Sequence, residues 1–155
     1  MTGEAATSVL EGAGVRFELL PHGVTESAIA EADALGLSPA EVGKTIMLTT
    51  PAGYVRAVLP ASERIDLHKV RDVLEGRKHV HLASEDDLAR DYPEFELGAI
   101  PPFAGHRHDP VLVDRRLAGR ESIVLEAGSR TASVRMQTGD LVSLTRATVV
   151  DICQD

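Results

Sequence analysis

The sequence predicts an α+β protein with a mixed, largely antiparallel sheet of about six to eight strands and helices packed around it. Short runs that are β-branched, or that alternate apolar and polar residues, recur from residue 15 to residue 152. Helix-capping residues mark the segments between these runs. No internal repeat, low-complexity tract or linker divides the chain, so we expect a single domain over residues 1–155.

The N-terminal part of the chain predicts two helices with a strand between them. Residues 7–12 have a helical pattern that ends at a glycine. In residues 15–20, VRFELL, apolar and charged side chains alternate with the period of a half-buried strand. Residues 25–36 carry apolar side chains and alanines and end at Gly36, the residue type that commonly caps a helix.

A capping box and a hairpin follow. Residues 38–41, SPAE, place serine at the N-cap, proline at the first helical position and glutamate three residues after the serine. We expect a short helix that breaks at Gly43, with Lys44 as the first residue of a strand. Residues 45–50 and 54–60 are β-branched and apolar and are separated by PAG, which predicts a hairpin.

The rest of the chain alternates capped helices, strands and one long irregular segment. Asp66 and Ser84 are expected to cap two helices, with a strand at residues 78–83 between them. Residues 92–110 hold four prolines and two glycines, too many for a regular element, and such loops often carry function. Further strands are expected at residues 111–114, 122–128, 132–136 and 147–152, with a helix at 138–145.

Composition excludes several classes of protein. The formal net charge of -8 argues against a surface that grips nucleic acid by its phosphates over its whole area, so no DNA partner is predicted. A local basic patch is compatible with this charge, and the residues that could form one for a nucleic-acid backbone are Lys69, Arg71, Arg77 and Lys78. No apolar run approaches the roughly 20 residues that span a bilayer, and no secretory pattern opens the chain, which favours a cytoplasmic protein.

Cysteine and histidine positions predict no cofactor and no metal. Cys153 is the one cysteine, so no internal disulfide or CxxC motif exists, and a structural thiol is favoured over a nucleophile. The cluster at residues 106–109 offers two histidines and one carboxylate, without a second cluster to complete a tetrahedral site. His79 and His81 are expected to share the surface face of a strand.

The tripeptide Gly43-Lys44-Thr45 is not the end of a phosphate-binding P-loop. That motif requires a glycine where this chain has Ser38, and it requires a helix where this chain predicts a strand. Two interpretations of Lys44 remain. It is a solvated lysine at the start of a strand, or it presents a fixed positive charge to an anionic or carbonyl-bearing ligand.

The order of these features resembles the YbaK/prolyl-tRNA editing family over nearly the whole chain, from Leu10 to Ile152. Gly98 and Pro101 match the GxxP loop of that family, and Lys44 matches its strand lysine. The segments that carry the resemblance are ESAIAEADALGL, EVGKTIMLTT, YVRAVLPASERIDLHKVRDVL, HLASEDDL, LGAIPPFAG, PVLVDRRL, EAGSR and GDLVSLTRATVVDI. No single motif is decisive, but their order and spacing together are specific.

The resemblance implies a free-standing deacylase with an open pocket. Such an enzyme hydrolyses the ester between a wrong, small amino acid (alanine, cysteine, serine or similar) and the acceptor end of a tRNA, usually tRNA for proline, and a prolyl-tRNA synthetase is a possible partner. The resemblance implies catalytic roles for Lys44, Gly98 and Pro101. The substrate-binding residues that it implies are Thr45, Ala99, Ile100, Gly128 and Ser129.

One departure from the family concerns a histidine. The prolyl-synthetase editing domain and its alanine-specific relatives carry a histidine just after the small-residue turn, whereas residues 129–133 read SRTAS here. Two other functions are kept open. The missing histidine motivates the first, a catalytically weak module of the same fold that binds aminoacyl-tRNA, and the second is a hydrolase of free small-molecule esters. The amino acid that is removed and the tRNA that is read are left open.

Overall fold

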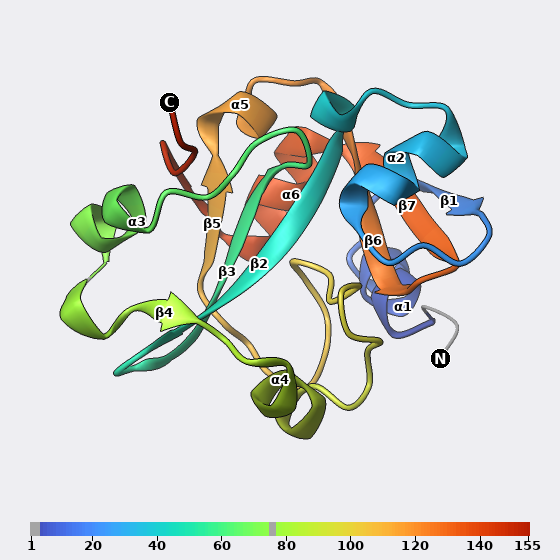
Figure 1. Ribbon diagram of the computed structural model, residues 1–155. Coiled ribbons are helices and arrows are strands. Elements are labelled where there is room, and N and C mark those ends of the chain that lie inside the picture. Colours follow the sequence, from blue (N-terminus) through green and yellow to red (C-terminus); the bar gives the residue numbers. More distant parts are fainter. Residues whose placement is uncertain (1–3, 75–76) are drawn as a thin grey trace.

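The computed structural model describes residues 4–74 and 77–155 and centres on one mixed sheet (Figure 1). The sheet has eight strands in the order β1-β7-β6-β2-β3-β5-β8, and β4 adds to β2 outside this path. The strands are β1 (Phe17–Pro21), β2 (Val42–Thr50), β3 (Gly53–Pro60), β4 (His81–Leu82), β5 (Val111–Asp114), β6 (Ser122–Ser129), β7 (Ala132–Gln137) and β8 (Thr148–Val150). The helices are α1 (Glu4–Gly12), α2 (Ala28–Leu35), α3 (Leu67–Val73), α4 (Glu85–Asp91), α5 (Arg115–Ala118) and α6 (Thr138–Thr145).

The predicted α+β class and mixed sheet are confirmed. Among the described residues, four strand pairs are antiparallel, β1 with β7, β2 with β3, β2 with β4 and β6 with β7. Three pairs are parallel, β2 with β6, β3 with β5 and β5 with β8. The parallel pair of β2 with β6 lies at the centre of the sheet, and the other two parallel pairs join β3, β5 and the edge strand β8. No helix in the described part of the chain is long and apolar enough to span a bilayer.

Successive side chains of each strand point to opposite faces of the sheet. Both faces carry apolar side chains, and helices cover both. On one face, Val42 of β2 packs with Val124 of β6 and with Ala28 and Ala32 of α2. On the other face, α1 and α6 pack over Leu125 and its neighbours. The helix α3 packs through Val70 on the same face as α2. The central strands are therefore covered on both faces, whereas β1, β4 and β8 remain largely exposed.

The helix caps follow the sequence closely. Ser27 caps α2, and Gly36 ends it with a left-handed φ of 69°. The box at Ser38 is complete, since its hydroxyl accepts from Ala40 and its N–H donates to the Glu41 carboxylate at 2.8 Å. The helix that this capping box begins is a single 3-10 turn, Pro39–Glu41. Asp66 and Ser84 cap α3 and α4 as predicted.

Three local predictions were wrong. The strand β2 begins at Val42, so Gly43 lies inside the strand and Lys44 is its third residue. A Cβ at Gly43 would come within 2.7 Å of Leu125, so glycine there permits close packing instead of breaking the chain. Residues 78–83 yield only the two-residue strand β4, preceded by a 3-10 turn at Arg77–His79, so His79 and His81 share no strand face. The short helix α5 was not predicted.

Candidate functional site

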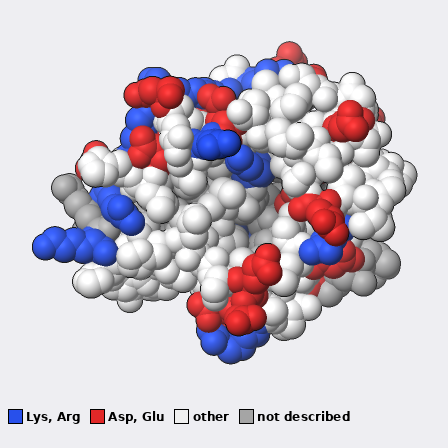
Figure 2. All heavy atoms as spheres, viewed as in Figure 1, with Lys and Arg blue, Asp and Glu red and all other residues white. Residues whose placement is uncertain are grey.

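The site begins at a fork between β2 and β6. These parallel strands pair at Val42 with Val124 and at Gly43 with Leu125, and the register between them ends there. In Figure 1 the two strands lie side by side near their starts and spread apart below, with the irregular segment (yellow) between them. Figure 2 shows a hollow in this region of the same face. The separation of the two strands therefore opens the sheet.

The predicted loop fills the fork by pairing with β6. The N–H of Gly128 donates to the carbonyl of Ala99 at 2.9 Å, and the N–H of Glu96 donates to the carbonyl of Gly128 at 3.0 Å. Gly128 has a φ of 94°, and a Cβ there would lie 2.7 Å from the ring of Phe95. A glycine is therefore required where the loop meets the strand. The structure brings together Gly98, Ala99 and Gly128, three of the residues predicted for the site.

The tip of the loop presents free backbone donors. Gly98 has a φ of 82°, and the N–H of Ala99 donates to the carbonyl of Glu96 at 3.1 Å. The N–H groups of Gly98 and Ile100 have no acceptor within the described residues. The side chain of Ile100 packs with Met47 on one face of β2. The two unsatisfied N–H groups are therefore available to a ligand oxygen.

Ser129 has a structural role in the turn after β6. Its side chain is buried, and its hydroxyl bonds the hydroxyl of Thr131 at 3.1 Å and accepts from the N–H of Thr131 at 3.2 Å. The next residue, Arg130, donates through Nε to the carbonyl of Leu97 at 2.9 Å. The hydroxyl predicted to bind substrate is thus engaged within the turn, which holds the loop from the β6 side.

Arg56 of β3 holds the other side of the loop and is only 1% exposed. Its guanidinium pairs with the carboxylate of Asp109 at 3.0 Å and lies 5.4 Å from the ring centroid of Tyr92. It also donates to three main-chain carbonyls of the loop, those of Pro101 (2.9 Å), Ala104 (3.0 Å) and Arg107 (3.2 Å). Ala104 has a left-handed φ of 73°, a strained state for a residue with a side chain, and it persists because its surroundings hold it.

Lys44 is the first residue of β2 beyond the pairs with β6. It lies on the face of Val42, while Thr45 and Met47 alternate to the face that packs on the loop. The side chain is half-buried and makes no hydrogen bond or ion pair with any described residue. Burial, followed by the Arg64 charge, lowers the pKa of Lys44, while Cys153 and Glu63 raise it. Lys44 is therefore a half-buried cation without a counter-ion.

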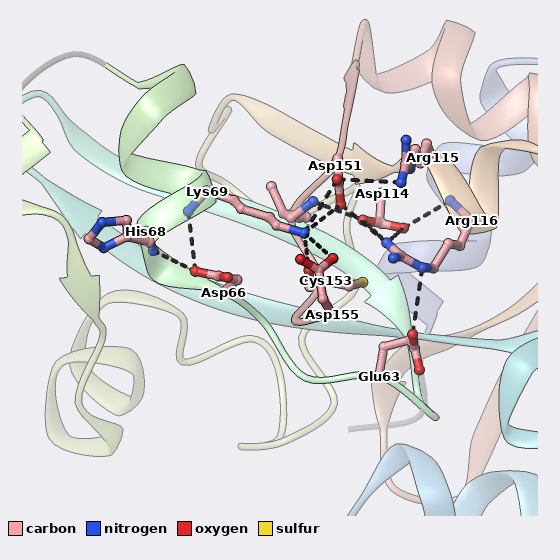
Figure 3. Close-up of polar contacts among 11 residues, drawn as sticks. Glu63, Asp66, His68, Lys69, Asp114, Arg115, Arg116, Asp151, Cys153 and Asp155 are labelled. Atoms are coloured by element: carbon pink, nitrogen blue, oxygen red, sulfur yellow. Dashed lines mark hydrogen bonds and ion pairs between the residues drawn. The ribbon is translucent and has the colours of Figure 1, made fainter.

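A charged cluster beside Lys44 is already self-paired (Figure 3). Lys69 reaches the carboxylates of Asp155 at 2.8 Å and Asp151 at 3.3 Å, and also the carbonyl of Cys153 at 2.8 Å. Arg116 pairs with Glu63 at 3.5 Å and with Asp151 at 3.2 Å. Glu63 is thus held by Arg116 and acts on Lys44 through its charge alone, without an ion pair between them.

This cluster includes one residue of the predicted basic patch. Lys69 is neutralised by carboxylates, so it presents no unpaired charge, whereas Arg71 donates to the neutral carbonyl of Val80 at 2.9 Å. Cys153 is buried, as expected of a structural thiol, and burial with the hydrogen bond to Asp114 raises its pKa to about 12. No group of three or more potential metal ligands occurs within the described residues.

Two buried carboxyl groups lie on the other arm of the fork. Glu126 is the first residue of β6 beyond the pairs with β2, and it lies on the face covered by α2. Glu31 of α2 is 1% exposed and accepts a hydrogen bond from Ser133, the cross-strand partner of Glu126. The hydroxyl of Ser133 also contacts Nε2 of His22 at 2.9 Å. The other oxygen of Glu31, Oε1, has no hydrogen-bond partner.

Burial makes these carboxyl groups weak acids. It raises the pKa of Glu31 to about 7, against a smaller lowering by the Ser133 hydrogen bond. Burial also raises the pKa of Glu126 well above the usual range, and the charge of Glu31 raises it further. Neither carboxyl group forms an ion pair with a described lysine, arginine or histidine. The pair thus meets the fork without a compensating cation.

No role was predicted from the sequence for Arg56, Glu31 or Glu126. The sequence nevertheless marks each of them as a polar residue at a buried position. Arg56 and Glu126 interrupt apolar strands, and Glu31 lies between alanines that face the sheet. His22 was missed for another reason. It approaches the turn segment from the end of β1, so the segment that lacks a histidine in sequence has one beside it in space.

The fold and the fork define a known class of protein. A family model of the aminoacyl-tRNA editing domain matches residues 22–144. The chain therefore belongs to the aminoacyl-tRNA editing domain family, as the resemblance predicted. Among curated proteins, none matches the sequence.

Solved structures share the fold. A proposed trans-editing enzyme for prolyl tRNA synthetase superposes with a TM-score of 0.86 at 22% identity, covering 99% of this chain and 98% of that one. The hypothetical protein APE2540 superposes with a TM-score of 0.87 at 24% identity, covering 96% and 98%. A scaffold protein from computational epitope grafting gives 0.85 at 21% identity, covering 99% and 97%. At such identities these likenesses show the fold alone.

Replacing Arg56 is expected to release the loop. Arg56→Met leaves the carboxylate of Asp109 buried without its cation, which should lower the free energy of unfolding by about 3–5 kcal/mol in urea titrations. Limited proteolysis should then cut within residues 92–110. Arg135→Met is the matched control, because its ion pair with Glu18 is long (3.8 Å) and partly exposed, so a loss below about 1 kcal/mol is expected. Equal losses in the two variants would rule out this role for Arg56.

The free energy of unfolding should depend on pH through Glu31. Its pKa is about 7 in the folded protein against 4.5 for an ordinary glutamate, so the folded state favours the protonated form. The resulting stabilisation is complete below about pH 4.5 and is lost as the pH rises through 7. The loss amounts to roughly 3 kcal/mol, since one pKa unit is worth about 1.4 kcal/mol.

Glu31→Gln should remove this loss. Relative to the wild type, the free energy of unfolding of the variant should therefore rise between roughly pH 5 and pH 8. Urea titrations across this range measure the difference. The exposed Glu121→Gln serves as the control and should follow the wild type. Parallel curves for Glu31→Gln and the wild type would show that the proton on Glu31 does not stabilise the fold.

Proposed function

We propose that the protein is a trans-editing deacylase that hydrolyses the ester of a mischarged tRNA, most plausibly tRNA for proline carrying a small wrong amino acid. Membership of the editing family supports action on aminoacyl-tRNA. The relation of one structural neighbour to prolyl tRNA synthetase supports the choice of tRNA and suggests that such a synthetase is a partner. The acceptor end of the tRNA is the part that enters the fork.

The observation that carries this proposal is that two segments each bring unsatisfied polar groups to the fork. The free N–H groups of Gly98 and Ile100 stand on the loop, and the uncompensated ammonium of Lys44 stands on the neighbouring strand. Buried polar groups are normally satisfied within the fold, so donors left free at an opening point to a ligand with negative or developing negative charge. An ester at the 3′ end of a nucleic acid offers both kinds of charge.

The chemistry requires no metal and no side-chain nucleophile. Water attacks the ester carbonyl, the oxyanion forms, and the bond to the ribose oxygen breaks to release the amino acid and a free 3′ hydroxyl. Backbone N–H groups held in place stabilise the oxyanion, and each such donor contributes about 3–4 kcal/mol in other enzymes. In this role the loop from Gly98 to Pro101 binds the carbonyl, with Ala99 orienting its neighbours. Lys44 binds the sugar-phosphate end, with Thr45 beside it.

Editing at a second pocket answers a physical limit of synthetases. Their pockets separate amino acids that differ by one methylene by only about 1–3 kcal/mol, so errors need a second, size-excluding site. The loop side chain Ile100 and the turn at Gly128 bound the opening on the loop side. Both are apolar or small, which suits an amino acid without a long polar side chain.

A catalytically weak module that binds aminoacyl-tRNA is the second candidate. The absence of a histidine in residues 129–133 favours it, as does the engagement of the Ser129 hydroxyl within its own turn. Turnover separates the two candidates. A panel of tRNAs mischarged with alanine, cysteine, serine or threonine is incubated with the protein, and released amino acid is compared with the rate in buffer. Binding without accelerated release would establish the module instead of the enzyme.

Lys44→Ala should lower the rate of deacylation strongly while leaving the fold intact. The side chain makes no hydrogen bond or ion pair within the described residues, so its loss costs the fold little. Its loss removes a fixed charge from the opening, for which a decrease of about 100-fold is expected. Rates on the best mischarged tRNA and thermal unfolding measure both effects. Arg135→Ala is the control and should keep the wild-type rate, whereas an unchanged rate for Lys44→Ala would exclude the lysine from the mechanism.

A further inference from the structure

We infer that Glu31, Glu126 and Ser133 form an ammonium-binding subsite that receives the α-ammonium group of the aminoacyl ester. The inference rests on the proposed function and deepens it, because it states which chemical group of the substrate selects this pocket. The observation behind it is a pair of buried carboxyl groups where β6 parts from β2, without an ion-pair partner among the described residues. The unpartnered oxygen Oε1 of Glu31 is the group that most needs a donor.

The positions of the two arms of the fork support this subsite. Lys44 and Glu126 are each the first residue beyond the last pair of β2 with β6, and both side chains lie on the face of α2. No ion pair joins them, nor does either one pair with another described residue. A cation stands on one arm and a carboxyl group on the other. An aminoacyl ester has the complementary order of charges, with phosphates on one side of the ester and an ammonium group on the other.

The energetics favour a ligand cation over an empty pair. A buried carboxylate without a partner is costly, and the free protein avoids the cost by keeping a proton on the pair. An arriving ammonium group replaces this proton as the compensating charge and can donate up to three hydrogen bonds. Oε1 of Glu31 and the carboxylate of Glu126 are unbonded acceptors for them. An N-acylated amino acid carries no charge there, so it would leave the proton on the pair and gain no charge pair.

A polar chain leads from the pair toward the surface. Nδ1 of His22 lies 2.7 Å from the carbonyl of Gly23, and Nε2 of the same ring contacts the hydroxyl of Ser133 at 2.9 Å. That hydroxyl donates to Glu31. The buried carboxyl group of Glu31 is therefore joined through Ser133 to the partly exposed ring of His22. The titratable groups facing this pair are Glu31 itself, Glu126 and His22, with Lys44 across the fork.

The test uses a pair of non-hydrolysable probes and the intact protein. The probes are 3′-alanylamido-3′-deoxyadenosine with a free amine and the same molecule acetylated on that amine. Calorimetry should show that the wild type binds the free-amine probe at least about tenfold more tightly, as expected for a buried charge pair. Glu126→Gln and Glu31→Gln should each reduce this preference to about twofold or less. Glu121→Gln, an exposed carboxylate at the start of the same segment, should keep it.

The outcomes separate the subsite from the proposed function. An absent preference in the wild type, or a preference that survives in both Gln variants, overturns the subsite even if mischarged tRNA is hydrolysed. A wild type that neither binds the probes nor hydrolyses any mischarged tRNA overturns the subsite and the proposed function together. The Gln substitutions keep size and remove a buried charge, so thermal unfolding should show them folded. On a hydrolysable substrate, Glu126→Gln should raise KM for the free-amine form and leave KM for the N-acetyl form unchanged.

Discussion

The early separation of β2 from β6 is the constraint on which the rest of the site depends. Two parallel strands that continued in register would satisfy their own main chains and close the sheet over this region. Here the register ends after Gly43 and Leu125, so the freed edge of β6 must find other partners. The loop supplies them through Ala99 and Glu96, and this places the turn at Gly98 inside the sheet. A single interruption in strand pairing thereby creates the opening and brings a loop into it.

Satisfied and unsatisfied groups are distributed unevenly around the opening. The frame of the loop is bonded on both sides, by Arg56 on one and by the turn at Arg130 on the other. The charged groups on the two arms of the fork, Lys44 and the carboxyl pair, form no ion pair within the described residues, and Oε1 of Glu31 has no hydrogen-bond partner. Binding sites work when a rigid surround holds a few reactive groups in place, and such groups are costly to the fold itself. This editing domain shows both properties, with the bonded loop on the Met47 face of the sheet and the unpaired charges on the Val42 face.

Much of the architecture could be predicted from local patterns. The helix caps involve only residues close together in the sequence, so local patterns predict them. These caps are Gly36, Ser38, Asp66 and Ser84. The resemblance identified the family and the loop, because the order of motifs survives changes in individual residues. What could not be predicted involves residues distant in sequence. The meeting of Glu31 with Ser133, and of Arg56 with Pro101, depends on strand order, which periodicity does not encode. The role of Gly43 was predicted wrongly, because the sequence does not distinguish a glycine that permits close packing from one that ends a helix.

The grip of Arg56 has a consequence for how this protein can diversify. Its guanidinium bonds the carbonyls of Pro101, Ala104 and Arg107, and a carbonyl is present whatever side chain the residue bears. The shape of the loop is therefore insulated from exchange of its side chains, except where a left-handed backbone restricts the choice. Descendants of this sequence could alter the walls of the opening, and with them the amino acid admitted, while inheriting the same scaffold. A buried arginine thus supplies evolutionary latitude at the position where selectivity is decided.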